Sequence, residues 1–161
     1  KVITPEMRTG KAHSPRGRAV WTVAGHDFEF IHVASNLFWG FQKIWVNSWQ
    51  QVNITDLERT ALDLIARPDI FGGFSAAIEI LENAINQVNM DRLVDYGLKY
   101  DMGSVIKRLG WALENLGFAG NSLESLRVYP VKRYYLLDPG LEETSAIKNS
   151  RWHITENLKR F

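Results

Sequence analysis

The sequence predicts an α+β fold: N-terminal β-strands, then a central run of four to five helices, then two C-terminal strands. Apolar and polar residues alternate before residue 54 and again after residue 133, as they do in strands. Between these regions, apolar residues recur every three to four positions, as in amphipathic helices. Strands that are segregated from a helical run favour α+β over a doubly wound sheet. We expect the last two strands to rejoin the first sheet.

The composition predicts one globular domain over residues 19–161, because 45% of the 161 residues are hydrophobic. Residues 1–18 are rich in Gly, Pro, Ser and basic side chains, so we expect a basic arm or linker, with a short strand that Pro5 would end. The absence of cysteine excludes a disulfide scaffold and a thiolate metal site. The net charge of +1 means that nucleic-acid binding would depend on local clusters.

The first third of the chain is expected to form strands at residues 19–23, 27–33, 40–46 and 49–54, with a tight hairpin at 24–26 and a helical turn at 35–39. Four tryptophans fall in this part: Trp21, Trp39, Trp45 and Trp49. They could form a platform for stacking bases. Because no basic residues interleave with them, we expect them in a hydrophobic core instead.

The stretch from Val52 to Gly73 joins the β part to the helical part. Thr55 and Glu58 have the spacing of a capping box at a helix N-terminus. One apolar stripe follows on the predicted helix: Leu57, Ala61, Leu64 and Ile65. Pro68 should end this helix, and Gly72-Gly73 should give the next turn free backbone choice.

Further helices are predicted over residues 74–88, 91–100, 105–116 and 122–129, and the last strands over 134–137 and 151–155. Gly117 follows the stripe of the 105–116 helix, where a glycine typically ends a helix in the left-handed conformation. No apolar run approaches the ~20 residues that span a bilayer, so we expect no membrane association.

No catalytic or metal-binding motif is evident, and the four histidines lack ligand spacing. Asp56 and Asp63 are placed on the solvent side of the first helix, where Asp63 can pair with Arg67. Glu58 is expected to cap. The sequence therefore predicts no catalytic residue, no cofactor and no enzyme activity.

A basic face is the alternative kind of site. Lys107 and Arg108 are expected on the exposed side of the third long helix, Lys132 and Arg133 at the start of the penultimate strand, and Arg151 near the end. Together they could contact phosphates. Dispersed salt pairs are the other explanation, because 18 acidic residues nearly balance 19 basic ones.

Several segments resemble AbiEi-type antitoxins. Residues 53–63 (Asn-Ile-Thr-Asp-Leu-Glu-Arg-Thr-Ala-Leu-Asp) with Arg67-Pro68 and Gly72-Gly73 resemble one family signature, and residues 107–117 (Lys-Arg-Leu-Gly-Trp-Ala-Leu-Glu-Asn-Leu-Gly) resemble a second. Residues 150–157 are similar to the family's final strand, and residues 28–33 and 38–41 fit the segments before the first signature. The resemblance covers residues 18–157.

This resemblance implies the antitoxin of a bacterial type IV toxin–antitoxin system, a transcriptional regulator in phage defence by abortive infection. The partner would be a nucleotidyltransferase-like toxin, countered without a stable complex, and the regulator would bind operator DNA in the cytoplasm and repress its own operon. Family members carry an N-terminal winged helix-turn-helix, but residues 1–50 show no such pattern. Either the DNA-binding domain has been cut away, or this is a member of the family without one.

The motif residues are expected to be structural: Thr55, Leu57, Glu58, Arg59, Thr60, Asp63, Pro68, Gly72, Gly73, Arg108, Leu109, Gly110, Glu114 and Trp152. Two alternatives stay open. One is a metal-dependent, nucleic-acid-processing defence enzyme that uses Asp56, Asp63 and Asp69. The other is a plain protein-binding module.

Overall fold

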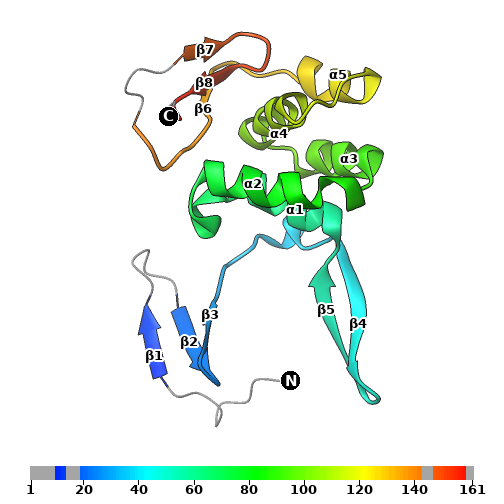
Figure 1. Ribbon diagram of the computed structural model, residues 1–161, viewed down its shortest axis with the longest axis vertical. Helices are drawn as coiled ribbons and strands as arrows, with labels where there is room; N and C mark the ends of the chain where they lie inside the picture. The colour runs from blue at the N-terminus through cyan, green and yellow to red at the C-terminus, as the bar shows by residue number, and fades with distance from the viewer. Residues whose placement is uncertain (1–9, 14–18, 143–146, 159–161) are drawn as a thin grey trace. The chain divides into compact units, whose positions relative to one another are not determined.

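The computed structural model describes residues 10–13, 19–142 and 147–158, and its helices and strands confirm the α+β class (Figure 1). The chain divides into two compact units. The first contains Lys1–Trp39 and Lys43–Val52, and the second contains Gly40–Gln42 and Asn53–Phe161. The predicted domain over residues 19–161 thus contains parts of both units, which are described separately below.

The first unit contains an antiparallel sheet of β1 (Gly10–His13), β2 (Ala19–Val23) and β3 (His26–Glu29). Ala24 and Gly25 form the β2–β3 turn with φ values of 51° and 78°, as a tight hairpin requires, so this predicted hairpin is confirmed. β1 corrects the expectation of a loop at this position. The short strand predicted before Pro5 lies outside the described residues.

A short 3-10 helix at Ser35–Leu37 confirms the predicted helical turn, and the hairpin of β4 (Phe41–Asn47) and β5 (Gln50–Thr55) follows. The Trp49 N–H donates to the Asn47 side-chain oxygen at 3.0 Å, which fixes the turn. Every residue of β4 is exposed. Trp45 is 64% exposed and Trp49 is 89% exposed, so the prediction that both lie in a core is wrong. A two-stranded ribbon has no interior in which to bury them.

The second unit is built on five helices (Figure 1). Their bounds are α1 Leu57–Ala66, α2 Phe74–Ala84, α3 Met90–Tyr100, α4 Gly103–Asn115 and α5 Asn121–Val128, with 3-10 turns at Pro68–Phe71 and Ile85–Gln87. α1 packs against α2, α3 and α4. The apolar stripes predicted from the sequence meet in this core, whose fully buried side chains include Leu62, Phe74, Leu93, Leu109 and Leu126.

The helix boundaries follow from the residues that were expected to set them. α1 ends at Ala66, before Pro68, and Gly72 and Gly73 adopt φ values of 92° and 102° that favour glycine. Gly117 follows α4 with a φ of 86°, as predicted for the residue that ends this helix.

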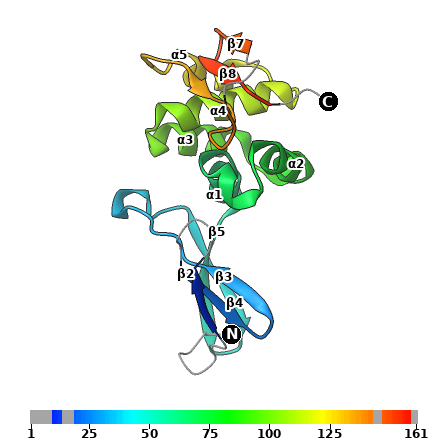
Figure 2. The ribbon, with the colours of Figure 1, turned by 90° about the vertical axis from the view of Figure 1, so that its left-hand side faces the viewer.

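The C-terminal strands form a sheet of their own, in the order β6-β8-β7. β6 (Tyr135–Leu136) pairs parallel with β8 (Ile154–Glu156), and β7 (Ile147–Asn149) pairs antiparallel with β8. The expectation that the last strands rejoin the N-terminal sheet is therefore wrong. Both views place β8 beside α4, against which it packs (Figures 1 and 2). The sequence missed β7.

Candidate functional site

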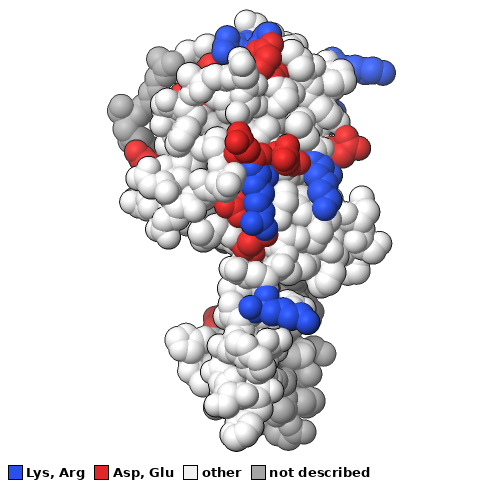
Figure 3. Space-filling model, turned by 90° about the vertical axis from the view of Figure 1, so that its right-hand side faces the viewer, with Lys and Arg blue, Asp and Glu red and all other residues white. Residues whose placement is uncertain are grey.

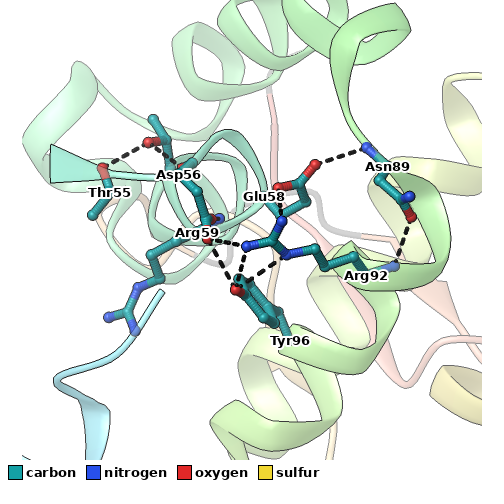
Figure 4. Close-up of polar contacts among 8 residues, drawn as sticks. Thr55, Asp56, Glu58, Arg59, Asn89, Arg92 and Tyr96 are labelled. Atoms are coloured by element: carbon teal, nitrogen blue, oxygen red, sulfur yellow. Dashed lines mark hydrogen bonds and ion pairs between the residues drawn. The ribbon is translucent and has the colours of Figure 1, made fainter. Parts of the chain in front are cut away.

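The N-terminus of α1 is held by a network of polar side chains (Figure 4). Asp56 is the N-cap, and its carboxylate accepts the Arg59 N–H at 2.8 Å. The same carboxylate accepts hydrogen bonds from Arg92 at 2.5 Å and from the Tyr96 hydroxyl at 2.9 Å. Asp56 is buried rather than on the solvent side as predicted. The network joins α1 to α3.

The predicted capping box of Thr55 and Glu58 is wrong by one residue, because Asp56 takes the capping position. The Thr55 hydroxyl instead pairs with the Thr60 hydroxyl at 2.8 Å. Glu58 accepts the Asn89 N–H at 2.8 Å, at the residue that caps α3. Leu57, the first residue of α1, is 45% exposed. It therefore does not belong to the apolar stripe that is buried in the core.

Arg59 and Asp63 form an ion pair one turn apart on α1, with Arg59 Nε 3.0 Å from Asp63 Oδ1. Arg59 is buried, and its guanidinium lies 5.6 Å from the centre of the Tyr100 ring. Burial raises the pKa of Asp63, while the charges of Arg59 and Arg67 oppose that rise. Asp63 accepts a hydrogen bond from Arg59, which the sequence did not indicate, and the charge of its expected partner Arg67 also favours the ionised carboxylate.

Motif residues of α4 contact the C-terminal segment. A Cβ atom added to Gly110 would lie 2.0 Å from the Trp152 ring, so only glycine fits there. The Trp152 indole donates to Glu114 at 2.6 Å. Leu109, on the same helix, is fully buried and lies against Gly97 of α3. Gly110 and Glu114 thus hold Trp152 of the C-terminal segment against α4, and Leu109 packs α4 against α3.

Two of the predicted phosphate-binding residues are buried in the helical core, so the expectation that they are exposed is wrong. Lys107 has no exposed surface, and its ammonium donates to the backbone oxygens of Leu126 and Arg127 at 3.0 and 2.6 Å. Arg108 is 7% exposed and donates to the Leu136 carbonyl at 2.9 Å. Both side chains satisfy carbonyl groups at the ends of other elements instead of facing solvent.

The predicted basic residues that are exposed are Lys132, Arg133 and Arg151, and Lys148, which the sequence did not indicate, is exposed as well. Lys132 and Arg133 precede β6, and Lys148 on β7 lies 5.6 Å from the ring centre of Tyr134. We call Lys132, Arg133 and Lys148 the C-terminal basic surface. Lys148 was missed because the strand that carries it was missed.

Arg151 is less available to a polyanion. Its guanidinium Nε lies 2.6 Å from a Glu114 oxygen, in a hollow of about 240 Å³ that Glu124 and Arg127 also line. The pKa of Glu124 is lowered by its hydrogen bond with Arg127. Two carboxylates therefore face two guanidinium groups, and the hollow carries little net charge.

His153 lies beside the C-terminal basic surface, with its ring 5.4 Å from that of Tyr134. Its backbone has a φ of 52°, which is uncommon outside glycine. Its Nδ1 atom is buried without a hydrogen-bond partner among the described residues. Backbone strain and unsatisfied polar atoms are concentrated at functional sites, so the end of the C-terminal sheet where β6 and β8 begin is the candidate interface.

On the face drawn in Figure 3, several groups of lysine and arginine atoms lie beside aspartate and glutamate atoms. Within the described part of the chain, no group of three or more histidine, aspartate or glutamate side chains is placed to hold a metal ion. The described helices include none that is long and apolar enough to cross a membrane.

No family model, curated protein or solved structure matches the chain.

Proposed function

We propose that this chain is the antitoxin domain of a bacterial type IV toxin–antitoxin system of the AbiEi type. It counters a nucleotidyltransferase-like toxin in the cytoplasm during abortive infection and contributes to repression of its own operon. It acts without catalysis, and no stable complex with the toxin is required. The proposal starts from the motif resemblance in the sequence.

The observation that carries the proposal is that the resembling segments meet in the structure. α1, from the first signature, packs against α4, from the second. Gly110 and Glu114 of the second signature both contact Trp152 of the final segment. These contacts join residues that are 42 and 38 positions apart in the sequence. Their contact supports the view that the signatures mark one architecture.

The C-terminal basic surface is where we place the contact with operator DNA. Lys132, Arg133 and Lys148 are exposed, and none of them is in a described ion pair with a carboxylate. Exposed lysine and arginine side chains supply the sequence-independent part of DNA affinity by releasing counterions from phosphates.

The alternative of a metal-dependent enzyme is less well supported. Asp56 accepts a backbone N–H, a guanidinium and a phenol, and Asp63 is paired with Arg59. A nuclease would need these carboxylates free to bind a cation. Metal-dependent nuclease activity that disappears in an Asp63→Ala variant would contradict the non-enzymatic proposal.

The decisive experiment is co-expression with the cognate toxin. The chain should restore growth that the toxin alone arrests, and failure to restore growth would contradict the antitoxin proposal. The Gly110→Trp variant, which cannot seat Trp152, should lose the rescue because the fold is lost. The Lys99→Ala variant changes an exposed lysine on α3 and should keep it.

DNA binding is tested separately, by titrating the chain with a duplex from upstream of its operon over a range of salt concentrations. Replacing Lys132, Arg133 and Lys148 together by alanine should weaken binding at low salt. It should also reduce the slope of log K against log salt by about 0.9 for each phosphate that the variant no longer neutralises. An unchanged slope would remove the C-terminal basic surface from the proposal and leave toxin neutralisation standing.

A further inference from the structure

The β4–β5 hairpin presents a large apolar surface to solvent. All nine residues from 41 to 49 are exposed, and the turn carries the most exposed tryptophan, Trp49. Its large exposed apolar side chains, apart from Phe41 at its base, are Ile44, Trp45, Val46, Trp49 and Ile54. Monomeric proteins rarely expose so many large apolar residues together, and such patches mark interaction sites.

The charge of this hairpin argues for a protein partner rather than a nucleic acid. Residues 41–55 contain one charged side chain, Lys43, and the chain has no acidic residue between Glu29 and Asp56. Nucleic-acid binding draws on several cationic side chains. The core of a protein interface is instead depleted in charge and enriched in aromatic residues, among which tryptophan is a frequent anchor.

The strand pairing also leaves the hairpin incomplete. β4 and β5 form a two-stranded sheet, so each strand has an edge that no third described strand occupies. A hairpin of two strands is marginally stable in water by itself, and exposed edges are templates for pairing with another chain. A partner that covers one face or adds strands would stabilise this element.

We propose that the partner is a second copy of this chain, and that two hairpins pack around a two-fold axis with Trp45 and Trp49 at the centre. A two-fold interface brings the same patch of each copy together, and the single Lys43 adds little repulsion. Covering the two tryptophans would remove about 300 Å² of accessible surface per chain. Side chains alternate along β4, so Ile44 and Val46 point away from Trp45 and add nothing to this area, and the interface stays below the ~800 Å² per partner of a standard interface.

The oligomeric state of the whole chain tests the proposal. Light scattering after size exclusion should give twice the mass of the 18.5-kDa chain, falling to the monomer on dilution. The Trp45→Lys, Trp49→Lys double variant should weaken the dimer by at least ~30-fold, the effect of removing one interface anchor. The matched control is Val128→Lys, at an exposed apolar residue on α5, which should leave the dimer unchanged.

Amide hydrogen exchange locates the interface without a variant. Residues 41–55 should become more protected as the concentration of the wild-type chain rises, and α5 should not. A monomer at every soluble concentration would overturn the proposal. So would a dimer that survives the double variant with its helical circular dichroism intact. Nucleic acid or another protein that protects residues 41–55 in place of a second copy would also overturn it.

Discussion

Lys107 shows how a residue that looks like a surface cation can serve the fold. Its ammonium donates to two carbonyls at the C-terminal end of α5, where helix carbonyls lack partners and the helix dipole favours positive charge. Burial lowers the pKa of Lys107 below its ordinary value of 10.5, and repulsion from Arg127 lowers it further. The two hydrogen bonds offset part of the cost of burying the charge.

A pH dependence follows for the Lys107→Met variant. We expect it to lose about 1–3 kcal/mol of unfolding free energy at pH 7, because two carbonyls lose their donor. Between the lowered folded pKa and 10.5, the unfolded chain binds a proton that the folded chain does not, so wild-type stability rises with pH. Urea unfolding from pH 8 to 10.5 should therefore show the gap between wild type and variant widening.

The control for this experiment is Lys107→Arg, whose side chain stays charged throughout the same range. Its stability relative to Lys107→Met should not change with pH. If the gap between wild type and Lys107→Met stayed constant up to pH 10.5, Lys107 would have an ordinary pKa, and its burial would be in doubt.

At the scale of single elements, the start of α1 depends on Asp56. This carboxylate caps the helix and receives hydrogen bonds from Arg92 and Tyr96 of α3. Asp56→Ala should lower the unfolding free energy by about 1–3 kcal/mol, since it loses the cap and leaves the α3 donors without their acceptor. Urea unfolding followed by circular dichroism measures the change.

The matched comparison is Thr55→Ala, which removes the hydroxyl that the sequence pattern suggested as the cap. Its bond to Thr60 is exposed, so we expect a loss below about 0.5 kcal/mol. A loss as large as that of Asp56→Ala would restore the capping box of Thr55 and Glu58. Asp56→Asn, which keeps a capping oxygen but not the charge, should lie between the other two variants.

The elements that the sequence predicted well are those whose signal is local. The helical periods, the stop at Pro68 and the turn at Ala24-Gly25 depend on residues a few positions apart. β1 and β7 were missed because they lie in polar stretches rich in the Gly, Ser and charged residues that are typical of loops. The cap was misplaced by one residue because Thr55 and Asp56 are both good capping residues, and only packing against α3 distinguishes them.

At the scale of the whole second unit, Gly110 and Trp152 hold the C-terminal segment on α4. We expect Gly110→Ala to lower the unfolding free energy by about 1–3 kcal/mol, because its methyl group would overlap the buried Trp152 ring. In a Trp152→Leu chain the same change should be neutral or stabilising by up to ~1 kcal/mol, since alanine is the better helix former. Urea unfolding of the wild type, the two single variants and the double variant gives the coupling free energy between residues 110 and 152.

If Gly110→Ala lowered the unfolding free energy equally in the wild-type chain and in the Trp152→Leu chain, the Trp152 indole would not lie against α4. In the sequence, Gly110 stood out only as a glycine within a motif. Periodicity alone could not predict that it lies against Trp152. The same limit explains the errors at the candidate site. Whether Lys107 or Trp45 is exposed depends on which elements pack over it. The spacing of apolar and polar residues along the sequence does not determine that packing.

The Asp138 carboxylate accepts the Phe74 N–H at the start of α2. Phe74 is synthesised sixty-four residues before Asp138. Asp138 is itself held by Asn157, nineteen residues later still, through a hydrogen bond of 2.9 Å. The carboxylate that accepts the first N–H of α2 is therefore available only after all five helices have been synthesised. Until Asn157 has been synthesised, the nascent chain lacks the hydrogen bond that holds Asp138, the residue whose carboxylate accepts the first N–H of α2.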